Sequence, residues 1–422
     1  MAAQKEAQPG DLFLLHAGIY EGTFSIERNG EPGKPIVWRA FGDGEAVIDG
    51  GGKGGKLAER VISASGIHDV WFERLTIRNG EWGVVAHDSA RVVVRRCHIH
   101  DVHNGLTATR NTQDELNGFF ISDNLIEGPF KWVTPNANEW HQLWEKYEYL
   151  GIEISGCGHD VCYNRIRHFK DAMDTFPSRH CAAIDFHHND CSESLDDGCE
   201  MDYSERNTRC FLNRFTNVFQ GISLQPVFGG PVYVFRNALY NVFKEPFKLH
   251  NVPSGALVFH NTVVKQGPPT MLYTSESPHN CIFRNNLFIG MGPDNYGAEY
   301  SPKMIECDFD YDGFGGGPWK NFLKWNGERY KSIDEARAKA PVYRHAVQVD
   351  PASTFASGLK PPESPDTQFD NAINDLRLTP ESAAVDAGEV LPGFNDGFKG
   401  NAPDLGAYEL GSELPWYGPR KE

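Results

Sequence analysis

The sequence predicts an all-β solenoid, in which short parallel strands stack coil upon coil. Three observations predict it. Similar segments return at a nearly constant spacing of 22 to 26 residues, each contains short runs of alternating apolar residues, and glycine or asparagine interrupts the runs. These segments have neither the apolar spacing of an amphipathic helix nor the leucine pattern of leucine-rich repeats. Each repeat is therefore interpreted as one coil of a parallel solenoid.

The repeat is clearest in four segments, RCFLNRF, VYVFRNAL, ALVFHNTV and NCIFRNNL. Two columns step by 24 residues: the asparagines Asn213, Asn237, Asn261 and Asn285, and the phenylalanines Phe211, Phe235, Phe259 and Phe283. Upstream, the asparagine column continues at Asn124, Asn164 and Asn189. We interpret the phenylalanines as an inward stack, and the asparagines as turn residues whose side-chain amides bond coil to coil. About ten coils are expected between residues 35 and 290.

The two ends of the chain differ from the repeats. Residues 9–50 are interpreted as an entry cap and first coil, and a short helix is expected over residues 332–340. We expect one structural domain in two parts. Residues 1–318 form the β-helix with its N-terminal cap and an aromatic insertion at 129–149, and residues 319–422 form the helical insertion, the last coils and a C-terminal cap. Caps cover the apolar core and strand edges that an open solenoid end exposes.

Composition restricts the partners. The formal charge of −17 and the pI near 5.4 argue against a nucleic acid, which requires a basic surface. The sequence has no apolar run of about 18 residues, so no membrane span is expected. The first residues lack the apolar core of a signal peptide. The expected location is nevertheless secreted or periplasmic. The nine cysteines show no CxxC pair and no zinc spacing, and are expected to be buried thiols.

Three stretches carry a resemblance: PGD…AGIY…PIVWRAFGDGEAVIDG at the start, VDP at 349–351, and DAGEVLP…APDLGAYE near the end. They resemble the right-handed parallel β-helix superfamily of pectate lyase type over nearly the whole chain. The resemblance implies a right-handed β-helix of about ten or more coils with short helical insertions. It also implies a carbohydrate-active protein, because that superfamily holds polysaccharide lyases, polygalacturonase-like and other glycoside hydrolases, epimerases and phage tailspikes.

The strands that precede the asparagine column align in GIEISG, AMDTFP, GCEMDY, GISLQP and PFKLHN, which begin at residues 151, 172, 198, 221 and 246. Their second and fourth positions are mostly apolar and are expected to point inward, and the third and fifth to point to solvent. The third and fifth positions include Glu153, Asp174, Glu200, Asp202, Gln225, Lys248 and His250, and Asp171 and Asp197 directly precede two of the strands. A carboxylate-rich groove is therefore predicted over residues 151–250.

Paired carboxylates in a groove indicate glycoside hydrolysis, which requires one carboxyl as proton donor and a second as base or nucleophile. We predict Asp174, Asp197 and Glu200 as the acid–base group. Supporting or substrate-binding roles are predicted for Glu153, Asp171, Asp202, Gln225, Lys248 and His250. Coils about 4.8 Å apart offer carboxylate separations for both retaining and inverting mechanisms, and both stay open. The segments LDDG and DAMD are similar to those of polygalacturonase-like enzymes, whose Gly-His-Gly and Arg-x-Lys signatures are absent.

Calcium chemistry is the alternative. Glu200 and Asp202 point the same way on one strand, and carboxylate oxygens suit Ca²⁺. The segment CEMDYSER resembles the chondroitinase B and alginate lyase group, in which calcium neutralises a uronate and a lysine or arginine removes a proton. That resemblance implies a calcium-dependent polysaccharide lyase or a uronate epimerase, with Arg206 or Lys248 as base. The sequence departs from the group at Gln225, where an arginine is expected.

The aromatic insertion has two interpretations. Trp140 and Trp144 either pack onto the solenoid at helical spacing, or form a lid whose rings stack on sugars. A last alternative, from a different class, is a non-catalytic glycan-binding or tailspike-like protein. Tailspikes are usually trimers with a long β-rich C-terminus, whereas this chain ends in a compact cap, so a monomer is expected.

Overall fold

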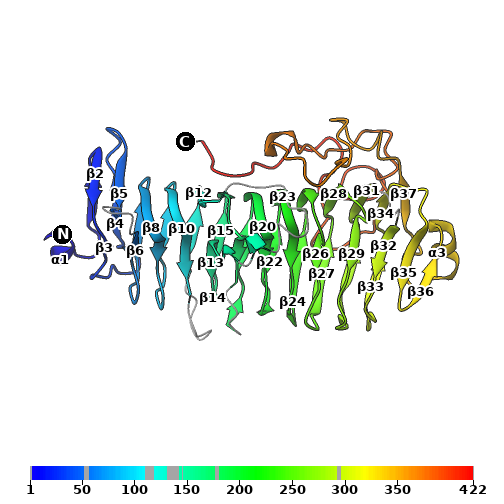
Figure 1. Cartoon of the computed structure of the whole chain (residues 1–422), viewed down its shortest axis with the longest axis horizontal. Coiled ribbons are helices and arrows are strands. Elements are labelled where there is room, and N and C mark those ends of the chain that lie inside the picture. Colours follow the sequence, from blue (N-terminus) through cyan, green and yellow to red (C-terminus); the bar gives the residue numbers. More distant parts are fainter. Residues whose placement is uncertain are drawn as a thin grey trace. The chain divides into compact units, whose positions relative to one another are not determined.

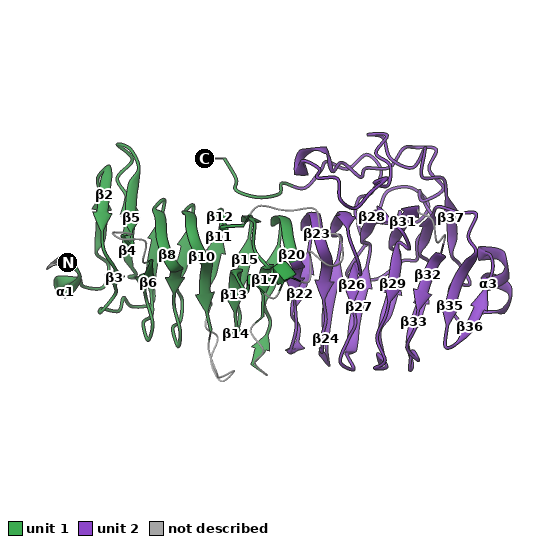
Figure 2. Cartoon of the chain, in the orientation of Figure 1, with its two compact units in different colours: residues 1–133, 141–195, 416–422 green, residues 134–140, 196–415 purple. Residues whose placement is uncertain are grey.

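A computed structural model describes residues 2–51, 57–109, 118–130, 142–144, 146–175, 180–291 and 296–421. It divides into two compact units, each described by itself (Figure 2). Unit 1 comprises Met1–Val133, His141–Leu195 and Trp416–Glu422, and unit 2 comprises Thr134–Trp140 and Asp196–Pro415. The chain is 4% helix, and its stacked parallel strands form a β-solenoid of about 11 turns. The predicted fold class, a parallel β-helix, is confirmed. No helix in the described ranges is long and apolar enough to cross a membrane.

Unit 1 consists of short parallel strands that stack as coils (Figure 1). One sheet has the order β1-β4-β7-β9-β11-β15-β19, a second runs β2-β5-β8-β10-β12-β16-β20, and a third runs β3-β6-β8-β10-β13-β17. The elements are α1 (Ala2–Glu6), β1 (Leu12–Leu15), β2 (Gly18–Glu21), β3 (Phe24–Ser25), β4 (Ile36–Ala40), β5 (Ala46–Asp49), β6 (Ala58–Ser63), β7 (Val70–Glu73), β8 (Thr76–Val85), β9 (Val93–Arg95), β10 (His98–Ala108), β11 (Phe120–Ser122), β12 (Leu125–Glu127), β13 (Leu150–Ile154), β14 (Gly156–Cys157), β15 (Asp160–Cys162), β16 (Arg165–Arg167), β17 (Asp171–Asp174), β18 (Cys181–Ala182), β19 (Asp185–His187) and the first part of β20 (Asp190–Glu200).

Unit 2 continues the same construction. Its sheets have the orders β22-β24-β27-β30-β33, β23-β25-β28-β31-β34-β37 and β29-β32-β35-β36, and β36 pairs antiparallel to β35. The elements are β21 (Ser204–Arg206), β22 (Arg209–Phe211), β23 (Arg214–Ser223), β24 (Phe228–Phe235), β25 (Ala238–Val242), β26 (Phe247–Lys248), β27 (Ser254–Phe259), β28 (Thr262–Gln266), β29 (Thr270–Leu272), β30 (Ile282–Arg284), β31 (Leu287–Met291), β32 (Tyr296–Tyr300), β33 (Asp308–Asp310), β34 (Gly313–Gly315), β35 (Asn321–Trp325), β36 (Glu328–Tyr330), α3 (Ile333–Lys339), β37 (Val347–Val349) and η1 (Asn371–Ile373).

A ladder of buried asparagines joins the coils, as predicted. Each side-chain oxygen accepts hydrogen bonds from both the backbone N–H and the side-chain amide of the asparagine one coil earlier. In unit 2 the amide-to-oxygen distances are 3.1 Å for Asn213 to Asn237 and 2.9 Å for Asn237 to Asn261. The residue before each asparagine has a positive φ, for example 54° at Arg236. The ladder therefore satisfies polar groups at a strained turn inside the core.

The structure corrects two details of the predicted columns. Asn261 bonds to Asn286 and not to Asn285, because that coil has 25 residues instead of 24. The inward stack of phenylalanines is wrong for Phe211, Phe235 and Phe259, which alternate with buried inward residues such as Val234. Those phenylalanines lie on the outer side, where the rings of Phe211 and Phe235 stack at 4.8 Å.

The C-terminal segment of unit 2 covers this outer side. Phe394 packs edge-on against Phe235 and Phe259, with centroid distances of 5.6 and 5.1 Å. The buried ring of His260 accepts from the amide of Asn395 at 2.9 Å. The orange part of the chain in Figure 1 lies along these coils, where Asn241 also donates to the carbonyl of Thr367. Apolar packing and satisfied amides together hold this long segment on the solenoid.

The predicted short helix is confirmed within one residue at each end. Helix α3 begins after Ser332, whose hydroxyl accepts from the backbone N–H of Glu335 at 3.2 Å. The carboxylate of Glu335 in turn accepts from the N–H of Lys331 at 2.8 Å. Acidic residues occupy its first turn and basic residues its last, which complements the helix dipole.

The last rung of the ladder is a carboxyl group. Asp312 is fully buried, and its Oδ1 accepts from the backbone and side chain of Asn286 at 2.7 and 3.0 Å. Its Oδ2 has no hydrogen-bond partner among the described residues. In the preceding rungs the corresponding atom is an amide nitrogen that donates to a carbonyl, as Asn286 does to Val258. Burial raises the pKa of Asp312 to about 8, because it disfavours the charged carboxylate more than the two hydrogen bonds from Asn286 stabilise it.

We expect Asp312→Asn to stabilise the protein at neutral pH. A raised carboxyl pKa contributes stability below about pH 4, and this contribution is lost as the pH rises through about 8. The variant should gain more than about 1.4 kcal/mol near pH 7, the equivalent of one pKa unit, and little near pH 4. Urea unfolding across this pH range measures the difference. Asp308→Asn, at an exposed carboxylate of β33, is the control, and a uniform effect at all pH values would contradict the prediction.

Candidate functional site

Lys248 occupies the centre of an acidic cluster in unit 2. It ends β26, and in the register of the parallel pair it lies opposite Ser223, which ends β23. One coil earlier, the backbone N–H of Met201 bonds to the carbonyl of Ser223 at 2.9 Å, which places Glu200 and Asp202 beside the same column. The predicted alignment of Glu200, Ser223 and Lys248 on neighbouring coils is therefore observed in the hydrogen bonding.

The ammonium group of Lys248 contacts two carboxylates. Its Nζ donates to Asp197 Oδ2 at 2.9 Å and lies 3.8 Å from Glu200 Oε1. A carboxylate oxygen of Asp197 also lies within 4.8 Å of one of Glu200. The Asp197 side chain is 0% exposed, that of Lys248 8% and that of Glu200 20%. Glu200 is thus the member of the cluster that solvent or a ligand reaches most easily.

Burial and charge change the proton affinities of the cluster. Burial raises the pKa of Asp197 to about 6, against the opposing effect of Lys248. Burial also raises the pKa of Asp202 well above its usual value. For Lys248, burial alone would lower the pKa, but Asp197, Asp196, Glu200 and Asp202 together raise it. The lysine therefore stays protonated as the counter-charge of its carboxylates.

Other polar groups hold the cluster in place. Asp202 Oδ1 accepts from the Ser223 hydroxyl and from the Gln225 backbone N–H, both at 2.7 Å. Gln220 donates to Asp196 at 3.2 Å. On the next coil, His250 Nε2 lies 2.8 Å from the fully buried carboxylate of Glu245. Of the predicted substrate-binding residues, Gln225 thus lies on one coil, and Lys248 and His250 lie on the next.

Sequence reasoning did not single out Ser223, Asp196, Gln220 or Glu245 as site residues. A signal was present for three of them, because Ser223, Gln220 and Glu245 occupy the same aligned columns as predicted residues; Asp196 directly precedes Asp197. Arg206, which the resemblance offers as a base, is exposed and lies 3.4 Å from the Glu205 carboxylate in the same unit.

The remaining predicted carboxylates lie in unit 1. In the register of β13 and β17, Glu153 lies opposite Asp174, and Asp171 lies opposite Leu150. Thr107, on β10, pairs with Glu153 on its other side and donates to its carboxylate at 2.7 Å. The register predicted for this column is confirmed.

The predicted exposure of these columns is wrong. Glu153 and Asp174 are each only 6% exposed, and Asp171, Asp202 and Lys248 are also buried. Parallel strands stack identical positions at about 4.8 Å, so each outward side chain is shielded by those of the coils above and below. Three of these buried groups take part in compensating bonds: Thr107 donates to Glu153, Ser223 donates to Asp202, and Lys248 donates to Asp197. Burial accordingly raises the pKa of Glu153, despite the bond from Thr107.

The aromatic insertion is described only in part. Trp140 lies outside the described residues. Trp144 is the last residue of a short helical stretch at 142–144, and the Lys170 ammonium lies 4.4 Å from the centre of its ring. Tyr149 stacks on His103 of β10 at 4.5 Å. These contacts join Trp144 and Tyr149 to residues of unit 1, and both interpretations of the insertion, packing and a lid, stay predictions.

The donor set of the unit 2 cluster fits a hard divalent cation. Four carboxylates, from Asp196, Asp197, Glu200 and Asp202, act on one lysine, so the cluster has an excess of negative charge. Oxygen ligands of this type suit Ca²⁺. Asp197 and Glu200 are the members whose oxygens lie close together, whereas Asp202 Oδ1 already accepts two hydrogen bonds. Among the described residues of unit 2, Asp197 and Glu200 are therefore the carboxylates close enough to share an ion, and the pair of Glu200 and Asp202 stays a prediction.

The comparisons with known proteins find similar backbone structures only. No family model and no curated protein matches the sequence. Pectate lyase Pel9A is 16% identical, with coverage of 97% of this chain and 90% of that chain and a TM-score of 0.49. XylC in complex with xylose is 10% identical, with coverage of 97% and 94% and a TM-score of 0.49. A mannuronic acid specific polysaccharide family 6 lyase from human gut microbiota is 17% identical, with coverage of 75% and 79% and a TM-score of 0.43. At these identities and TM-scores the similarities identify no reaction for this chain.

We expect Lys248→Met to destabilise the protein strongly near neutral pH. Removal of one partner leaves buried carboxylates without their counter-charge, which typically costs about 3 to 5 kcal/mol. The loss should shrink at low pH, because Asp197, whose pKa is about 6 even beside Lys248, then takes up a proton and no longer needs a counter-charge. Urea unfolding near pH 8 and near pH 5 measures this. Lys244→Met, at a partly exposed lysine four residues away, serves as the control. An equal loss at both pH values would show that Lys248 acts by packing alone.

Proposed function

We propose that the protein cleaves a uronate-containing polysaccharide by calcium-dependent β-elimination, with Lys248 as the base. The observation that carries the proposal is the position of Lys248 Nζ, 2.9 Å from Asp197 and 3.8 Å from Glu200, within a cluster of four carboxylates. Such a cluster combines the two components of this reaction, oxygen ligands for a dication and an amine that can accept a proton.

The chemistry explains why both components are required. In β-elimination the proton on C5 of a uronate passes to a base, a C4–C5 double bond forms, and the bond from C4 to the leaving oxygen breaks. That proton is weakly acidic until the neighbouring carboxylate is neutralised. A calcium ion held by Asp197 and Glu200 would supply this neutralisation as a Lewis acid.

The protonation state of Lys248 links its role as a base to the binding of calcium. Its carboxylates raise the pKa of Lys248, and a protonated lysine cannot serve as a base. A dication on the same carboxylates would replace the ammonium group as their counter-charge, which is the condition for a neutral amine. The base and the metal site are therefore coupled, and activity without calcium is not expected.

Neighbouring groups complete the proposed site. Gln225 and His250, on the coils of β23 and β26, are placed to position the sugar. The bond between His250 and the buried carboxylate of Glu245 orients the imidazole ring. The exposed part of Glu200 is the point at which a uronate carboxylate would approach the cluster.

Hydrolysis is the second candidate, and a different observation favours it. The pKa of Asp197 is raised to about 6 beside the partly exposed Glu200, within 4.8 Å. A carboxyl of raised pKa close to a second carboxyl is the usual arrangement of acid and nucleophile in a retaining glycosidase. In this mechanism Lys248 would be a positioning residue only.

The masses of the products distinguish the two mechanisms. We expect a panel of polyuronates with calcium to give unsaturated products, with no water added per cut and a new ultraviolet absorbance. Chelation with EDTA should abolish the reaction, and added calcium should restore it. Products that carry one added water per cut, formed equally with EDTA, would overturn elimination and favour the Asp197–Glu200 pair. Neutral glycans in the same panel are the control.

A charge-preserving variant tests the role of Lys248. Lys248→Arg keeps the positive charge that the buried carboxylates require, but arginine is not deprotonated in proteins. If Lys248 is the base, the variant should fold, shown by an unchanged circular dichroism spectrum, and lose at least about 10²-fold in kcat. Lys244→Arg should retain activity. Retention of most activity by Lys248→Arg would show that the lysine only positions the carboxylates.

A further inference from the structure

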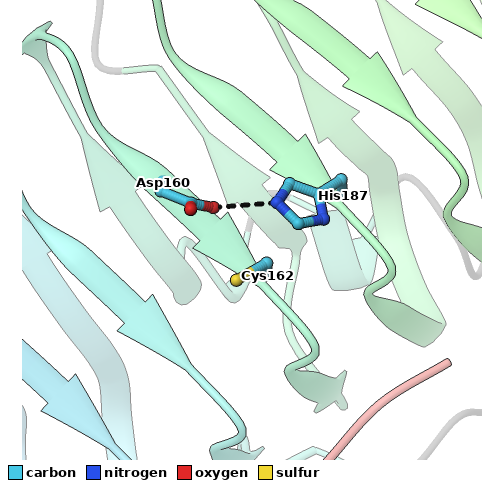
Figure 3. A group of neighbouring side chains, drawn as sticks. All are labelled: Asp160, Cys162 and His187. Atoms are coloured by element: carbon cyan, nitrogen blue, oxygen red, sulfur yellow. Dashed lines mark ion pairs between the residues drawn. The ribbon is translucent and has the colours of Figure 1, made fainter. Parts of the chain in front are cut away.

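A second group of chemically reactive side chains lies in unit 1. It comes from two neighbouring strands of the first sheet, β15 and β19. In their parallel register, Asp160 lies opposite Asp185 and Cys162 lies opposite His187. Because side chains alternate along a strand, Asp160 and Cys162 share one face, and His187 lies on that face one coil on. Figure 3 shows the carboxylate, the thiol and the imidazole of these three residues gathered on adjacent strands.

The three side chains are close enough to bind one ion. His187 Nε2 lies 3.0 Å from Asp160 Oδ1, and one ligand atom from each residue falls within 4.8 Å of the other two. Despite this proximity, Asp160 Oδ1 is buried and has no hydrogen bond of good geometry from any described residue. The side chains of Asp160 and His187 are 43% and 18% exposed, so an ion can enter from solvent. Cys162 forms the closed side of the group, at 2% exposure.

The orientation of His187 is set by its neighbour. His187 Nδ1 lies 2.7 Å from Nδ1 of His188. One of these two rings donates to the other. When His187 is the donor, its Nε2 offers a lone pair on the side of Asp160 and Cys162, which a bound ion would use. A hydrogen bond on the second ring nitrogen is the usual support of a metal-binding histidine.

We propose that Asp160, Cys162 and His187 bind a zinc ion or a similar borderline transition-metal ion. Carboxylate oxygen, thiolate sulfur and imidazole nitrogen are the three ligand types that Zn²⁺ takes, at about 2.0 to 2.3 Å. Two ligands at such distances in a tetrahedron are separated by roughly 3.3 to 3.7 Å, which is close to the observed 3.0 Å between His187 and Asp160. Water would take the fourth position on the exposed side. Binding replaces the thiol proton, which is released to solvent, so the balance is one proton per ion.

The charges around the group are compatible with a cation. Arg420 lies nearby, with its guanidinium 3.9 Å from the centre of the Tyr163 ring, but it is held by both carboxylate oxygens of Asp123 at 2.8 and 2.6 Å. Its charge is thus largely compensated. The backbone N–H of Gly418 donates to the carbonyl of His188 at 2.9 Å. An ion at this position would link β15 and β19 next to the C-terminal segment of the chain, which indicates a structural role.

Sulfur coordination provides a readout that is independent of the calcium site. We expect the full chain, freed of metal with a chelator and then titrated with Co²⁺, to show the near-ultraviolet absorption of a cobalt–thiolate bond, at one ion per chain. Zn²⁺ should displace it and raise Tm. Cys162→Ser should abolish the absorption, and His187→Gln and Asp160→Asn should weaken binding at least about tenfold. Calcium, which does not bind thiolates, should give no such signal, so a failed lyase assay leaves this test intact.

Two matched variants test whether another thiol or another histidine of unit 1 binds the ion. Cys97→Ser removes a buried thiol of the same unit, whose sulfur lies against the carbonyls of Phe72 and Arg95. His98→Gln removes a histidine that pairs with the carboxylate of Glu127 without a thiol. Both should retain the absorption. If the folded wild type shows no cobalt–thiolate band, or if folded Cys162→Ser retains it, the proposal is overturned, and the group is a histidine–aspartate ion pair beside an inert thiol.

Discussion

Parallel hydrogen bonding between successive coils is the constraint on which the rest of this structure depends. It stacks equivalent positions of the sequence at about 4.8 Å, whatever side chains they carry. Where the stacked residues are asparagines, the result is a buried ladder in which every amide donates and every carbonyl accepts. The same geometry would be costly for most other polar residues, since a buried polar group without a partner is strongly destabilising. The ladder therefore secures both the register and the turns with positive φ that precede it.

The same stacking generates the chemistry of the molecule. Backbone pairing holds carboxylates on adjacent coils close together although like charges repel, so each acidic column needs a compensating group. Thr107 supplies a hydroxyl donor to Glu153 in unit 1, and Lys248 supplies a full charge to Asp197 and Glu200 in unit 2. Burial in these stacked columns raises the pKa of Glu153, Asp197 and Asp202. A cluster with more carboxylates than lysines is inclined to accept a dication, and this property is the basis of the proposed calcium-dependent reaction.

The two proposed metal sites follow one structural rule with different donors. Each combines residues from a strand, or from its end, with a partner on another coil: Asp197 and Glu200 with Lys248, and Asp160 and Cys162 with His187. Oxygen donors beside an amine suit a hard ion and proton transfer. A thiol and an imidazole, with the second ring nitrogen of the imidazole held by His188, suit a borderline ion in a fixed position. A solenoid can therefore hold unrelated sites on separate coils, because each site needs only local register.

The sequence by itself determined the repeat, the ladder and the register. The 24-residue spacing of Asn213, Asn237 and Asn261 predicts the solenoid, and alternation along each strand predicts that Glu153 and Asp174, or Ser223 and Lys248, lie opposite each other. Only the tertiary structure decided the slip to Asn286, since one extra residue in a coil leaves no local signature. It also decided the burial of the outward carboxylates, which depends on the side chains of the coils above and below. The sequence analysis did not predict the grouping of Asp160 and Cys162 with His187, which lies 25 to 27 residues further along the chain; the parallel register of β15 and β19 brings the three together.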